Sequence, residues 1–72
     1  MKTYYFDMQD GAPVRDRRGL EFRTDSQAIE HSKELARRFS HEHPVKDDKL
    51  SIIVLNESGK EIHREAVYPI RS

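Results

Sequence analysis

The longest amphipathic pattern in the chain runs from Thr24 to His43. Its apolar or small residues recur with a helical period and fall within a stripe about 120° wide on one side of the helix. These residues are Ala28, Ile29, Ser32, Leu35, Ala36 and Phe39. The pattern predicts a helix over residues 25–42 that buries this stripe against another element.

Both ends of this helix carry local signals. Thr24 and Gln27 have the spacing of a capping box, in which the Thr hydroxyl accepts from the Gln27 amide and the Gln27 side chain reaches back to the first amide. Pro44 disfavours helical geometry at His43, so we expect the helix to end there.

The region before the helix has the alternation of a strand. Residues 3–8 place aromatic and apolar side chains on one side, which predicts a strand over this range. The side chains on that side are Tyr4, Phe6 and Met8. Turn residues at 9–12 predict a hairpin, and the returning strand is expected within residues 14–22, short and interrupted by a second turn at 16–19.

Two more strands are predicted after the helix. Residues 50–56 are apolar on both sides, which is typical of a central strand. Leu50, Ile52 and Val54 form one side, and Ile53 and Leu55 form the other. A turn at residues 56–59 leads to a strand at 60–68, on which alternation places Ile62, Ala66 and Tyr68 on one face and Val67 on the opposite face.

The order strand, strand, helix, strand, strand predicts an α+β fold. An antiparallel sheet of three to four strands, in ββαββ order, carries the helix on one face. The 72 residues are enough for a single domain with one thin core.

Several residue groups in this order resemble a known family. They are Tyr4, Tyr5 and Phe6, then Asp10 and Gly11, then Asp16, Gly19 and Glu21, the helix from Asp25, and Ile52, Val54, Asn56 and Gly59 around the last hairpin. The chain is similar in these positions to a family of small bacterial proteins classed as a domain of unknown function. The resemblance implies a bacterial origin and a compact fold, and it assigns no catalytic residue.

Composition limits the classes of function. The chain has 13 basic and 13 acidic residues, so its formal net charge is zero and no general attraction to nucleic acid or anionic membranes is expected. It has no cysteine, which excludes disulfides and thiolate chemistry, and no run of apolar residues long enough to cross a membrane. We expect a cytoplasmic protein.

The main functional hypothesis concerns the sheet face that one helix cannot cover. Alternation places Tyr5, Ile53, Leu55 and Val67 on that face. Monomers seldom leave such a patch in water, so we predict a non-enzymatic interaction module, with a second copy of the chain as the simplest cover. The alternative is that long Lys and Arg side chains, or the second strand region, shield this face within one copy.

Nucleic-acid binding is the second hypothesis. Arg15, Arg17 and Arg18 cluster after the first strand, and Arg37 and Arg38 lie on the helix. If both clusters lay side by side with Tyr5 exposed between them, they would bind single-stranded nucleic acid through its phosphates and by stacking.

The sequence offers weaker candidates for a metal site. His41 and His43 would share a face only on extended backbone, and we expect them to interact with the last helix carbonyls. Four carboxylates lie in or near the first hairpin, but they lack the spacing of a calcium loop, and Asx turns account for Asp10 and Asp16. The four are Asp7, Asp10, Asp16 and Glu21. We therefore predict no enzyme, metal or cofactor.

Overall fold

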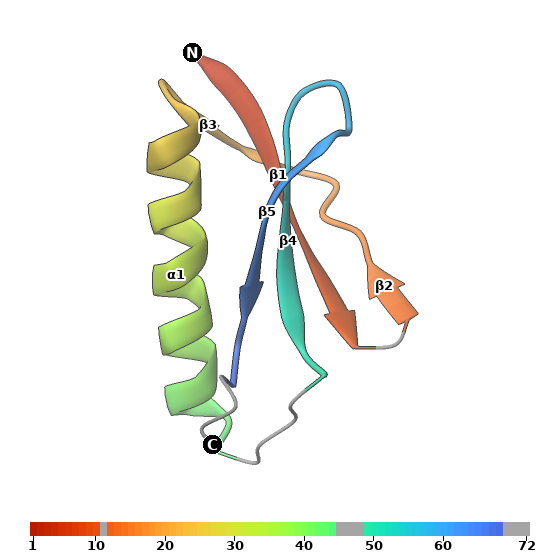
Figure 1. The fold of residues 1–72 in the computed structure, drawn as a ribbon, viewed down its shortest axis with the longest axis vertical. Coiled ribbons are helices and arrows are strands. Elements are labelled where there is room, and N and C mark those ends of the chain that lie inside the picture. The colour runs from red at the N-terminus through yellow and green to blue at the C-terminus, as the bar shows by residue number, and fades with distance from the viewer. Residues whose placement is uncertain (11, 45–48, 69–72) are drawn as a thin grey trace.

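The computed structural model describes residues 1–10, 12–44 and 49–68. Its elements in chain order are β1 (Lys2–Asp10), β2 (Ala12–Val14), β3 (Leu20–Phe22), α1 (Asp25–Glu42), β4 (Ser51–Leu55) and β5 (Glu61–Ala66). All strand pairs are antiparallel, in the order β2-β1-β4-β5, and β3 also pairs with β1 (Figure 1). The predicted α+β fold, with α1 on one face of the sheet, is confirmed.

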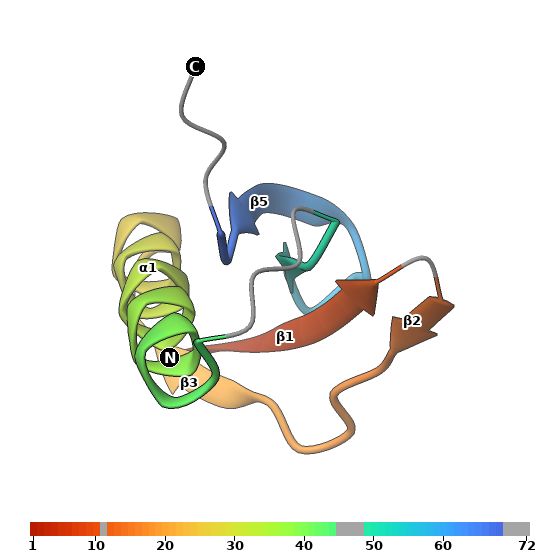
Figure 2. The ribbon, with the colours of Figure 1, turned by 90° about the horizontal axis from the view of Figure 1, so that it is seen from below.

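The long first strand organises the sheet. One edge of β1 pairs with the central strand β4, while β3 and β2 pair with its first and last residues along the other edge (Figure 2). The return predicted over residues 14–22 is therefore two short strands, one of which begins earlier, at residue 12. Residues 15–19 between them form a loop, and its side-chain bonds replace the strand pairing there.

Small residues let α1 approach the sheet closely. Ala28, Ser32 and Ala36 recur every fourth position of the helix and are buried. The Ser32 hydroxyl donates to the Ile29 carbonyl oxygen at 2.6 Å, which satisfies a polar group inside the core. Beneath these residues lie the apolar side chains of the sheet, Tyr4, Phe6, Ile52 and Val54, which are all buried.

The helix begins and ends where its local signals predict. Thr24 Oγ1 accepts from the Gln27 amide at 3.2 Å, as in a capping box. The reciprocal bond differs from the prediction, because Gln27 Oε1 accepts from the amide of Arg23 at 2.9 Å, one residue before the cap. At the other end the His43 amide donates to the Phe39 carbonyl at 2.8 Å.

A hydrogen bond ties the start of the helix to the sheet. Tyr4 is buried in β1, and its hydroxyl donates to Asp25 Oδ1 at 2.5 Å. This bond, together with burial and the nearby negative charges of Asp25 and Glu57, raises the pKa of Tyr4 to about 12. The first turn of α1 is thus held against the covered face of the sheet.

Candidate interaction surface on the open sheet face

The face of the sheet away from α1 has a small apolar floor. The strand register places Tyr5 opposite Leu55 and Asp7 opposite Ile53, so these four side chains share the face. Ile53 is only 6% exposed, and Tyr5 and Leu55 are half-buried. Three of the four predicted patch residues lie here, but the chain itself already covers much of them.

The prediction that Val67 lies on this open face is wrong. Val67 is 2% exposed and belongs to the core under α1. The reason is a register shift in β5: Val54 pairs with His63, whereas the next residue, Leu55, pairs with Glu61. Because of this extra residue, Glu61 points to the open face, whereas the odd-numbered residues after it point to the helix.

The same shift brings a hydrogen-bonded pair, His63 and Glu65, to the helix side of β5. His63 Nε2 and Glu65 Oε1 are 2.8 Å apart, and both side chains are about three-quarters buried. The sequence pattern did not predict this pair, because the position of an extra residue in a strand depends on its pairing partner.

The loop between β2 and β3 folds against the edge of the open face. Its centre is Asp16, whose Oδ2 accepts from the Phe6 amide at 3.2 Å in the middle of β1. Asp16 Oδ1 accepts from the amides of Arg18 at 2.9 Å and Gly19 at 3.2 Å. The Asp16 amide in turn donates to Asp7 Oδ1 at 2.8 Å. Asp16 thus takes the place of a strand residue in the ladder.

These hydrogen bonds keep Asp16 ionised. Partial burial by itself would raise the pKa of Asp16, but the amides of Arg18, Phe6 and Gly19 and the Arg18 charge outweigh it. The pKa of Asp16 is therefore lowered from its ordinary value. The predicted Asx turn is present as the bond to Arg18, while the bonds to β1 were not predicted, because they join residues nine and ten positions apart.

Gly19 allows the loop to return so closely to β1. Its φ is +69°, and a Cβ at this position would lie 2.8 Å from Thr3 Cγ2 and 2.9 Å from the Tyr4 carbonyl oxygen. It would also lie 3.0 Å from Tyr5 Cε1, which places the Tyr5 ring directly beside the loop. Only glycine fits both the backbone angle and the space.

The loop and the floor together enclose a shallow, open depression of about 440 Å³. It is lined by Tyr5, Asp7, Gln9, Arg15, Asp16, Ile53, Leu55 and Gly59. Its two carboxylates already accept backbone hydrogen bonds, and the side chains of its other polar residues are a phenol, an amide and a guanidinium.

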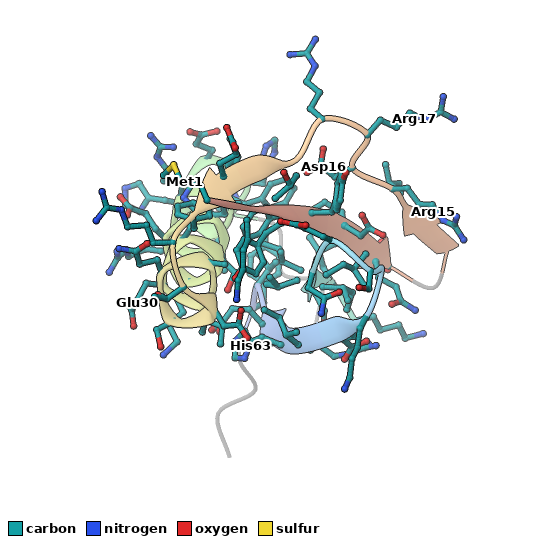
Figure 3. All side chains as sticks on the ribbon, turned by 90° about the horizontal axis from the view of Figure 1, so that it is seen from above. Met1, Arg15, Asp16, Arg17, Glu30 and His63 are labelled. Atoms are coloured by element: carbon teal, nitrogen blue, oxygen red, sulfur yellow. The ribbon has the colours of Figure 1, made fainter. Side chains whose placement is uncertain are left out.

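The five arginines that were predicted to bind nucleic acid do not form one surface. Arg15, Arg17 and Arg18 lie on the loop, and Figure 3 shows Arg15 and Arg17 projecting away from α1. Arg37 and Arg38 lie on α1, where Arg37 lines a separate groove against β3. The two arginine clusters therefore do not lie side by side, as the nucleic-acid hypothesis required.

The candidate metal ligands are also dispersed. His41 and His43 are exposed near the end of α1, and the His43 ring stacks on Phe39 with ring centroids 4.3 Å apart. Asp7 and Asp16 are neighbours, but Glu21 lines the groove beside α1. Within the described ranges, no three His, Asp or Glu side chains gather closely enough to hold a metal ion.

A family model matches residues 3–67 of the chain, described as Domain of unknown function (DUF6894). The chain belongs to this family. The match covers the described helix and strands except Lys2 at the start of β1, so the fold described above is that of a DUF6894 domain. Searches of curated proteins and of solved structures each found no match. None of the helices among the described residues has the length and apolar character to cross a membrane.

Proposed function

We propose that this DUF6894 domain is a non-enzymatic interaction module whose contact surface is the open sheet face. The half-buried side chains of Tyr5 and Leu55, which pair with each other next to Ile53, support the proposal, because covering them removes further apolar surface from water. The opposite face has less of this capacity, since α1 already buries its central residues. We propose the cytoplasm as its compartment, where a chain without cysteine is at no disadvantage.

Association through the face is favoured over association through the edges. On the β2 and β3 edge, the Asp16 carboxylate already occupies the Phe6 amide in the centre of β1. On the other edge, β5 carries the register shift, and the exposed ion pair of Glu61 and Arg64 lies where this edge borders the open face. Interruptions, bulges and charges of this kind disfavour the addition of another strand.

The partner that we propose is a second copy of the chain. Its formal net charge is zero, so two copies do not repel one another over long distances. A face of four strands projects only about 300 Å², estimated from strand spacing and rise, which falls within the range of weak, transient interfaces. The expected product is a dimer in rapid exchange with the monomer, in which each copy covers the Tyr5 and Leu55 of the other.

Sedimentation velocity over a range of micromolar concentrations tests the dimer. We expect a weight-average sedimentation coefficient that rises with concentration for the wild type and stays at the monomer value for Leu55→Lys. The matched control is Val14→Lys, because Val14 is 67% exposed and pairs with Met8, which faces the helix side. A wild type that is monomeric at every concentration, or equal effects of both variants, would refute the proposal.

A further inference from the structure

The loop between β2 and β3 presents three cations that form no salt bridge among the described residues, although the charge of Arg18 acts on the nearby Asp16 carboxylate. Arg15, Arg17 and Arg18 are all exposed. The ion pairs among the described residues join other side chains, on α1 and β5. Asp16 is the acidic residue within this loop, and its oxygens accept from backbone amides. The loop is therefore a local basic patch on a chain without net charge.

The backbone that carries these cations is fixed before any ligand arrives. Asp16 accepts from the consecutive amides of Arg18 and Gly19 and from the centre of β1, and Gly19 packs tightly against Thr3 and Tyr4. A ligand that contacts the arginines therefore orders only their side chains. Such preorganisation lowers the entropy cost of binding.

An aromatic ring lies beside this patch. The close approach of Gly19 to Tyr5 Cε1 places the Tyr5 ring against the loop, and Tyr5 is half-buried with one part accessible. Arg15 and Tyr5 also line the same shallow depression. Guanidinium groups next to an accessible aromatic ring match the phosphates and the base of one strand of nucleic acid.

We propose that this loop binds single-stranded nucleic acid, with phosphates on Arg15, Arg17 and Arg18 and one base on Tyr5. A single strand fits because a base within a duplex is stacked on its neighbours and cannot reach a ring on the floor of a depression. The helix arginines, Arg37 and Arg38, take no part. Because the proposed dimer covers Tyr5, nucleic-acid binding and dimerisation exclude one another, and the nucleic acid binds the monomer.

Fluorescence anisotropy with a labelled oligothymidine at low salt, with the protein dilute enough to be monomeric, tests this site. Three phosphate contacts predict a slope of log affinity against log salt of about −2. We expect Arg17→Glu with Arg18→Glu to weaken binding about tenfold or more. The control, Arg37→Glu with Arg38→Glu, changes the net charge equally and should have a much smaller effect.

Tyr5→Leu distinguishes stacking from simple charge attraction. It should weaken binding about tenfold while leaving the salt slope unchanged, because stacking releases no counterions. The same sequence as a duplex should bind more weakly than the single strand. Absence of binding, equal losses in the two charge-reversed variants, or preference for the duplex would each overturn the proposal. Sedimentation velocity on the same variants shows whether each still forms the dimer. A failure of nucleic-acid binding can therefore be told apart from a failure of dimerisation.

Discussion

The two faces of the sheet are built from alternate residues of the same strands, yet they are covered in different ways. On one face, Tyr4 and Val54 are fully buried under the small residues of α1. On the other face, Ile53 reaches 6% exposure beside a loop that is held by hydrogen bonds to a carboxylate. Apolar packing by α1 buries the centre of the first face and leaves residues such as Phe22 and Leu50 partly exposed at its margin, whereas the polar loop covers only part of the second face.

This difference leaves half-buried groups accessible on the open face, beside the loop anchored at Asp16, whereas α1 occupies most of the covered face. We therefore expect the covered face to carry most of the stability, and we propose that the open face carries the binding surface. Each of the following experiments tests one part of this expectation.

The largest expected effect comes from adjacent isoleucines that point to opposite faces. Ile52 is 1% exposed beneath the helix, and Ile53 is 6% exposed on the open face between Asp7 and Arg64. We expect Ile52→Ala to cost about 4 kcal/mol of unfolding free energy and Ile53→Ala about 2 kcal/mol, because a rigid core relaxes less around the lost atoms. Urea denaturation of both variants measures the difference. Equal losses would contradict the unequal cover of the two faces.

A second pair of variants tests the loop that covers the open face. Gly19→Ala forces a Cβ against the Tyr4 carbonyl oxygen at positive φ, and we expect a cost of about 3 kcal/mol. Gly59→Ala is the control, because Gly59 has a φ of +80° but open space around it, and its cost should be about 1 kcal/mol. Thermal denaturation followed by circular dichroism compares them. If Gly59→Ala were as damaging as Gly19→Ala, close packing of the loop would not be the cause.

The fold was largely predictable because its signals are local. The helix stripe and the cap at Thr24 depend on residues within a few positions of each other, and the two apolar sides of residues 50–56 marked β4 as central. The open face was predicted less well. The bonds from Asp16 to β1 depend on tertiary pairing, and the extra residue in β5 reverses the side on which Val67 lies. Alternation of residues cannot reveal either feature.

Acid should weaken the open-face loop in a way that depends on Asp16. Because the folded-state pKa of Asp16 is lowered, its stabilisation is complete above its ordinary pKa of 3.8 and is lost as the pH falls through the folded value. Asp16→Asn should cost about 2 kcal/mol at neutral pH, since a charged acceptor is replaced by a neutral one. In urea denaturation from pH 7 to pH 2, the variant should lose less unfolding free energy on acidification than the wild type does. If the unfolding free energies of the two proteins fell in parallel with pH, the carboxylate would not be what holds the loop.

The smallest expected effect appears in alkali and belongs to the covered face. The pKa of Tyr4 is raised from 10.0 to about 12, so the folded state binds this proton more tightly than the unfolded chain does. The resulting stabilisation is complete below pH 10 and is lost as the pH rises through 12. Tyr4→Phe lacks the ionisable group, so its stability should decline less across this range, although at neutral pH it loses the bond to Asp25. Thermal denaturation between pH 8 and pH 12 measures both changes. An identical alkaline decline in the two proteins would mean that Tyr4 does not link β1 to α1 through its hydroxyl, and the covered face would then rest on apolar packing alone.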